Sequence, residues 1–159
     1  MSLSAIIPLS QQPQRAQEIA HFLFQEWHLL DNWANPLEVA ERLHQRNLPG
    51  SVGFTLLALS DGGELSGTAS VIEYELDDDP ARRYWLGEVF TLPAWRGQGI
   101  GSRLVNACIG RAQQQGVTEL WLYTPDQQAL YQRLGWREAE QREVSGEWVS
   151  VMVMVRELS

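Results

Sequence analysis

Residues 92–102 read LPAWRGQGIGS, and the hexad RGQGIG at 96–101 within them decides how the rest of the chain is interpreted. An apolar, strand-like segment precedes the hexad, and apolar residues at helical spacing follow it. Glycines at such a junction leave backbone N–H groups uncovered at a helix N-terminus, where unpaired amides and the helix dipole attract anions. The stretch therefore predicts a phosphate-binding loop.

Three kinds of phosphate-binding loop compete for this hexad. A Walker A loop needs a lysine after its last glycine, whereas Ser102 and Arg103 follow Gly101, so that loop is excluded. A dinucleotide-binding loop needs a glycine at the sixth position, which Ser102 occupies, and the flanking segments do not form repeated strand-helix-strand halves. The third kind depends on the order of the elements around the hexad.

The predicted elements alternate in an order that is typical of a mixed α/β fold. Apolar periodicity and turn residues predict helices at residues 14–30, 36–47, 100–116 and 126–134. The predicted strands cover residues 4–9, 52–59, 65–74, 84–92, 119–123, 136–144 and 148–155. The order β-α-α-β-β-β-α-β-α-β-β predicts one domain over residues 1–159, with a mixed sheet of about seven strands flanked by helices.

Composition excludes several classes of function. The net charge of −8 over 159 residues repels phosphate backbones, so we expect no nucleic-acid partner. No apolar run approaches the roughly 20 residues of a membrane helix, and the start of the chain lacks a secretory pattern, so we expect a cytoplasmic protein without a membrane partner. One cysteine and three histidines without metal-ligand spacing predict no metal site; they are Cys108, His21, His28 and His44.

Two motifs resemble the GCN5-related N-acetyltransferase (GNAT) superfamily. The hexad at 96–101 matches its signature Arg/Gln-x-x-Gly-x-Gly/Ala, and residues 129–136, ALYQRLGW, match its pattern Ala-x-x-Tyr-x-x-Leu-Gly-aromatic. The predicted order of elements agrees with that fold over nearly the whole chain. The chain is similar to bacterial small-molecule members, and the resemblance implies acetyl-CoA as cosubstrate, with its pyrophosphate at the hexad.

The resemblance also implies which residues bind the cofactor. Main-chain N–H groups of the hexad would hold the phosphates, and the end of the preceding strand would pair with the pantetheine. Arg96 either adds charge or braces the turn, and Thr124 stands where the family often has asparagine. The full predicted set is Thr91, Leu92, Arg96, Gly97, Gln98, Gly99, Ile100, Gly101, Ser102 and Thr124.

For the chemistry, the resemblance implies that Tyr131 is the general acid that protonates the departing thiolate, since a phenol can give its proton to so basic a group. Glu88 is the predicted general base, and strand alternation places Leu86 and Phe90 on its face of the sheet.

In this family the first two helices usually form one wall of the acceptor site, which implies substrate contacts for Glu26, Trp27 and Trp33. The acidic segment at residues 73–79 is interpreted as a solvated loop, with attraction of a cationic ligand as the alternative. These observations predict an acetyl-CoA-dependent N-acetyltransferase that acts by direct attack of a primary amine of a small molecule, cationic by preference, or of a peptide. The alternative is a non-catalytic acyl-CoA-binding sensor or regulatory module. A homodimer is compatible with the sequence.

Overall fold

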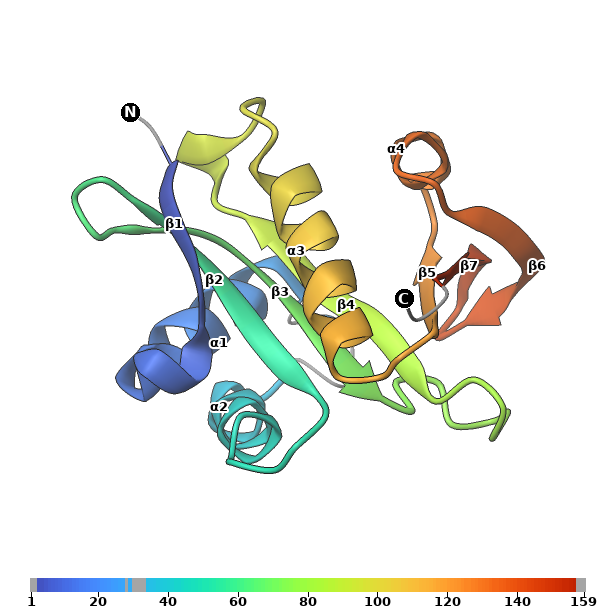
Figure 1. The fold of residues 1–159 in the computed structure, drawn as a ribbon, viewed down its shortest axis with the longest axis horizontal. Helices are drawn as coiled ribbons and strands as arrows, with labels where there is room; N and C mark the ends of the chain where they lie inside the picture. Colours follow the sequence, from blue (N-terminus) through green and yellow to red (C-terminus); the bar gives the residue numbers. More distant parts are fainter. Residues whose placement is uncertain (1–2, 28, 30–33, 157–159) are drawn as a thin grey trace.

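The computed structural model describes residues 3–27, 29 and 34–156 and shows a seven-stranded mixed sheet flanked by helices (Figure 1). The strands lie in the order β1-β2-β3-β4-β5-β7-β6, which confirms the predicted fold class. Their bounds are β1 Leu3–Pro8, β2 Phe54–Ser60, β3 Leu65–Glu73, β4 Tyr84–Thr91, β5 Glu119–Thr124, β6 Arg137–Val144 and β7 Glu147–Val155. The α-helices are α1 Ala16–Trp27, α2 Pro36–Arg46, α3 Ile100–Gln114 and α4 Gln128–Arg133.

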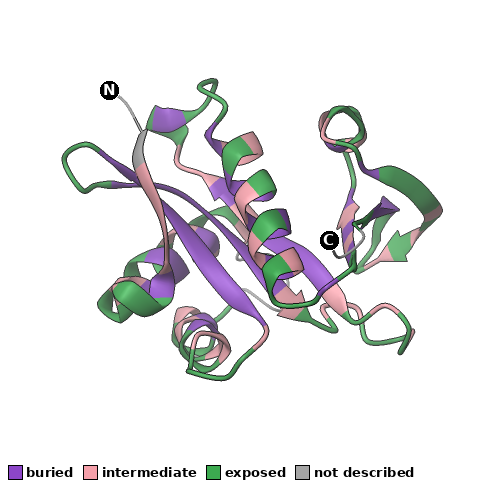
Figure 2. Ribbon diagram, viewed as in Figure 1, coloured by how far each residue is buried: buried purple, intermediate pink, exposed green. Residues whose placement is uncertain are grey.

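The sheet separates two hydrophobic cores. Alternate side chains of β2 point to opposite faces, so Leu56 and Ala58 join the core under α3, whereas Leu57 and Leu59 join the core under α1 and α2. Figure 1 shows α3 crossing one face, with α1 and α2 on the other. Strands β2 to β4 are consequently buried along most of their length (Figure 2).

The first two helices begin where local chemistry favours a start. Asn35 caps α2, because its Oδ1 accepts hydrogen bonds from Leu37 N and Glu38 N at 3.0 and 3.4 Å. Pro36 then occupies the first turn, where its missing N–H is not needed. Helix α1 starts later than predicted, because Pro13–Arg15 forms a turn of 3₁₀ helix.

Strands β4 and β5 run parallel but stay together only briefly. A single pair, Trp85 opposite Trp121, forms the register between them. Beyond it the two strands diverge, with α3 and α4 on either side of the widening gap (Figure 1). Beyond this pair, the backbone N–H and C=O groups of β4 and β5 that face the gap do not pair with each other and can bind other groups.

A bulge in β4 lies beside this divergence. Thr68 faces Phe90 and Ser70 faces Gly87, so two residues of β4 oppose one residue of β3. Glu88 lies within the bulge with a left-handed φ of 53°. The extra residue reverses the alternation, so Leu86 packs in the α3 core and Phe90 in the α1 and α2 core. The prediction that both share one face with Glu88 is wrong.

Candidate active site

The predicted phosphate loop lies directly at the start of α3. Gly97 and Gly99 adopt left-handed φ values of 81° and 77°, and no heavy atom lies within 4 Å of a Cβ built at either residue. Backbone angle rather than packing thus requires glycine at these two positions. Gly101 is already part of helix α3 and does not have a left-handed φ.

The first turn of α3 presents unpaired amides. The first hydrogen bond of the helix runs from Arg103 N to Gly99 O at 3.1 Å. The N–H groups of residues 100–102 therefore have no acceptor within the helix. No side chain caps this helix. The amides and the helix dipole together form a surface that suits an anion.

Arg96 braces the turn, which is one of the two roles that the sequence left open. Its Nε donates to Thr91 O at 3.0 Å, and its guanidinium carbon lies 5.6 Å from the centroid of the Phe90 ring. Its Nη2 lies 3.9 Å from Glu26 Oε2, with both side chains about half exposed. Glu26 of α1 therefore lies beside the phosphate loop.

The end of β4 is already partly paired. Leu92 N donates to Ser66 O at 2.9 Å within the sheet, and the predicted contact of Leu92 with the cofactor stays a prediction. Thr91 faces Gly67 as a pair without mutual hydrogen bonds, which turns its N–H and carbonyl away from β3 and towards the gap before β5. Arg96 Nε donates to the Thr91 carbonyl, whereas the Thr91 N–H is available to a ligand.

Tyr131 lies in α4, across the gap from the phosphate loop. Its ring packs edge-on against Trp136, with the centroids 6.0 Å apart, which explains the spacing of the second motif. Among the described residues its hydroxyl has no hydrogen-bond partner. Burial first, and then the charge of Glu75, raises its pKa to about 12. A phenol with such a pKa keeps its proton until a strong base arrives.

Thr124 holds the entry to α4. Its Oγ1 accepts a hydrogen bond from Gln127 N at 3.0 Å, and its carbonyl accepts one from Gln128 Nε2 at 3.4 Å. The helix begins at Gln128, two residues later than predicted. The Thr124 hydroxyl therefore fixes the turn that carries Tyr131, and its predicted contact with the cofactor stays a prediction.

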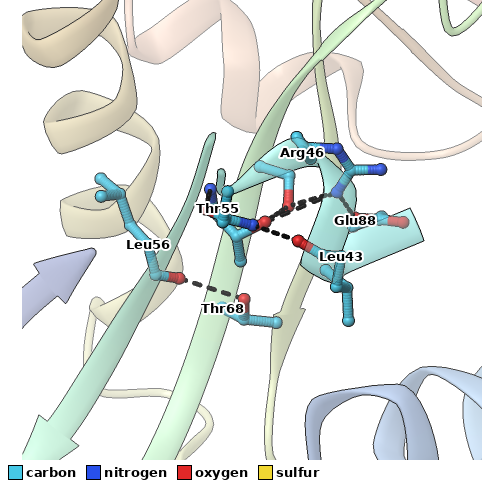
Figure 3. Close-up of polar contacts among 8 residues, drawn as sticks. Leu43, Arg46, Thr55, Leu56, Thr68 and Glu88 are labelled. Atoms are coloured by element: carbon cyan, nitrogen blue, oxygen red, sulfur yellow. Dashed lines mark hydrogen bonds and ion pairs between the residues drawn. The ribbon is translucent and has the colours of Figure 1, made fainter. Parts of the chain in front are cut away.

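Glu88 forms a buried ion pair on the α2 face of the sheet (Figure 3). Its Oε1 accepts a hydrogen bond from Arg46 Nη1 at 2.5 Å, and the two side chains are 3% and 11% exposed. The same Nη1 lies 3.3 Å from Ser70 Oγ and 3.5 Å from Thr55 Oγ1. Arg46 thus holds the carboxylate of Glu88, and Ser70 and Thr55 hold Arg46 in place.

A second carboxyl beside this pair was missed by the sequence analysis. Glu75 lies in the acidic segment interpreted as a solvated loop, yet its Oε2 is buried and has no hydrogen-bond partner among the described residues. A Cβ at Gly87 would collide with both of its carboxylate oxygens. The signal that could have found it is Gly87 itself, because a glycine inside a strand often marks a close approach.

Aromatic side chains line the same face. Trp85 packs against Trp121 and Tyr123, with centroid distances of 6.3 Å to each. Burial, followed by the charge of Glu75, raises the pKa of Tyr123. Trp27 of α1 packs edge-on against Phe90 at 6.0 Å between centroids. The predicted substrate residue Trp33, like His28, lies outside the described residues.

A cavity of about 600 Å³ lies away from this gap, between the C-terminal ends of α2 and α3. Leu43, Phe54 and Arg111 contribute to its wall, and none of the predicted site residues does. Within the part of the chain that the structure describes, no helix is long and apolar enough to cross a membrane.

Comparison with known proteins gives the geometry a family context. The model of the acetyltransferase (GNAT) family matches residues 16–136. An uncharacterised N-acetyltransferase of Methanocaldococcus jannaschii is 40% identical over 57 residues, which cover 33% of this chain and 25% of that protein. The matched segment thus spans about a quarter of that relative's length.

Two solved structures share the fold. A phosphinothricin acetyltransferase of Sinorhizobium meliloti, in complex with acetyl-CoA, superposes with a TM-score of 0.74 at 17% identity, over 98% of this chain and 89% of that one. A spermidine N-acetyltransferase of Vibrio cholerae superposes with a TM-score of 0.74 at 14% identity, over 95% and 92% of the two chains.

Proposed function

Because the chain belongs to the acetyltransferase (GNAT) family, we propose that it transfers the acetyl group of acetyl-CoA to a primary amine by direct attack. A small molecule is the proposed acceptor, and a peptide amine is the second choice. One observation carries the proposal: the start of α3, with its open amides, and α4, which carries Tyr131, lie on either side of the gap between β4 and β5 (Figure 1).

The residues at the gap fit coenzyme A. Backbone N–H groups of residues 98–102 would hold the pyrophosphate, and the Thr91 N–H would bind the pantetheine arm that enters between the strands. Acetyl-CoA supplies the activated thioester, and the chain supplies its orientation.

Tyr131 is the proposed proton donor to the departing sulfur. A packed ring and a free hydroxyl give it a fixed direction and an available proton. Thr124 supports this role indirectly, because it fixes the turn before α4.

Glu88, predicted from the sequence as the base, lies on the α2 face of the sheet, where its carboxylate is paired with Arg46. The net charge of −8 attracts an ammonium group over longer distances. A cationic acceptor is therefore the preferred class. The similar fold of a spermidine N-acetyltransferase supports the inclusion of polyamines among the candidates.

The test is release of free CoA thiol from acetyl-CoA with polyamines, aminoglycosides and peptides as acceptors. An enzyme releases thiol with at least one amine, whereas the alternative, an acyl-CoA-binding sensor, binds acetyl-CoA and releases none. Tyr131 favours the enzyme, because a sensor needs no acid at the sulfur.

A matched pair of variants tests the cofactor site separately. Gly99→Ala forces a side chain into a left-handed position and should raise the Kd of acetyl-CoA about tenfold, since the strain costs about 1–2 kcal/mol. Gly110→Ala, on the exposed face of α3 with nothing near the added Cβ, should leave the Kd unchanged. Equal affinities in the two variants would remove the loop from the proposal.

A further inference from the structure

Glu75 lies on the face of the sheet where an acceptor amine would arrive. The chain turns at Tyr74, which has a left-handed φ of 53°, and folds the Glu75 side chain back over β4. Gly87 faces Ser70, which also contacts Arg46, so the carboxyl of Glu75 lies on the α2 side of the sheet. Part of the residue is exposed, although its Oε2 is not.

The groups that face Glu75 leave it without a counterion. Arg46 lies on α2 and Glu88 on β4, and the charges of these two residues already neutralise each other in an ion pair. From β5 comes Tyr123 and from α4 comes Tyr131, both of which are uncharged near neutral pH. Glu75 is therefore a surplus acid among a satisfied ion pair and two phenols.

A buried acid of this kind suits proton transfer near neutrality. Burial first, and then the charge of Glu88, raises the pKa of Glu75 to about 8, while Arg46 acts in the opposite direction. A carboxyl kept for structure alone would have hydrogen-bond donors around it, as Glu138 has from Ser150 and Gln141. Glu75 Oε2 has no such donor among the described residues.

We propose that Glu75 is the group that pairs with the ammonium of the acceptor and accepts its proton. The inference rests on the proposed acetyl transfer and adds its proton acceptor. Tyr123 and the neighbouring Trp85 form an aromatic wall next to this carboxyl, which suits a cationic amine.

The step balances as follows. The Glu75 carboxylate takes one proton from the ammonium, and the neutral amine forms the C–N bond at the acetyl carbon while the C–S bond breaks. Tyr131 gives its proton to the departing sulfur and regains one from the nitrogen as the amide forms. Glu75 then releases its proton to water.

The experiment compares Glu75→Gln with Asp77→Asn, which removes the same charge from an exposed position of the same segment. Glutamine keeps the size of the protonated acid, so the substitution removes the carboxylate charge and proton acceptance without changing the shape of the side chain. With the best amine of the thiol-release panel, Glu75→Gln should lower kcat/KM about 100-fold. It should also abolish the rise of kcat/KM towards pH 8, with acetyl-CoA affinity unchanged. Asp77→Asn should retain both.

A second variant and a direct titration test the role of Glu75 independently. Gly87→Ala expels the carboxylate and should lower kcat/KM as Glu75→Gln does. Carbon-13 NMR of the side-chain carboxyls in the free protein, assigned with Glu75→Gln, should show one glutamate that titrates near 8. An ordinary titration for Glu75, or transfer by Glu75→Gln equal to that of Asp77→Asn, overturns the inference while acetyl transfer stands. A wild-type protein that releases no thiol with any amine overturns both.

Discussion

Replacing Arg46 with methionine should destabilise the protein severely. The substitution keeps an apolar stem of similar length but leaves the Glu88 carboxylate, only 3% exposed, without its cation. Removing one partner of such a buried pair costs about 3–5 kcal/mol, because the remaining charge stays desolvated. Solvent screening offers little relief, since Arg46 is itself 11% exposed.

Urea denaturation of three variants measures this effect. Arg46→Met alone should lower the free energy of unfolding by about 3–5 kcal/mol, and the double variant with Glu88→Gln should recover most of the loss. A loss below about 1 kcal/mol, as for exposed pairs, would refute the reasoning. So would strict additivity of the two single changes, because it would mean that the charges do not interact.

Three other predictions concern individual side chains. Tyr131→Phe should lower kcat about 100-fold with an unchanged Kd for acetyl-CoA. The control Tyr84→Phe, placed before β4 and β5 separate, should keep the wild-type kcat. Equal kcat values in the two variants would show that Tyr131 is not the acid. An unfolded carboxyl loses its proton above pH 4.5 and folded Glu75 only above about 8, so its contribution to stability is present below 4.5 and lost as the pH rises towards 8. Full burial would make that loss about 5 kcal/mol, and partial exposure reduces it to roughly 2 kcal/mol. Between pH 5 and pH 9 the free energy of unfolding of the wild type should therefore fall by this amount relative to that of Glu75→Gln. The same pH dependence in both proteins would contradict the prediction. Cys108 is 0% exposed and burial raises its pKa, so the native protein should not react with a thiol reagent that labels the unfolded chain, and rapid native labelling would show that the α3 core is open.

Local signals made the phosphate loop predictable. Left-handed angles need glycine, and Gly97 and Gly99 therefore appear in the sequence as a pattern that can be counted. Tyr131 was predicted from the resemblance of its motif to the family pattern, and its contact with Trp136 joins residues five apart within that motif. The order of the elements along the chain followed from periodicity and turns.

The surroundings of Glu88 and Glu75 were not predictable, because distant residues define them. The bulge places Glu88, which is not a glycine, at a left-handed φ and reverses the alternation, so alternation placed Leu86 and Phe90 wrongly on one face. Its ion pair joins α2 to β4 across 42 positions of the chain. An acidic run is usually solvated, and only the fold shows that Glu75 rests on a strand glycine instead.

The most direct test of the central claim follows the acetyl group itself. Acetyl-CoA carrying a carbon-13 label in its acetyl group is incubated with the wild-type protein and the amines of the panel, and the products and the protein are analysed by mass spectrometry. Direct transfer predicts the label in an amide of one amine, in equal amount to the CoA thiol released, with none on the protein. Label held by the protein, or thiol release that yields only acetate, would contradict the account.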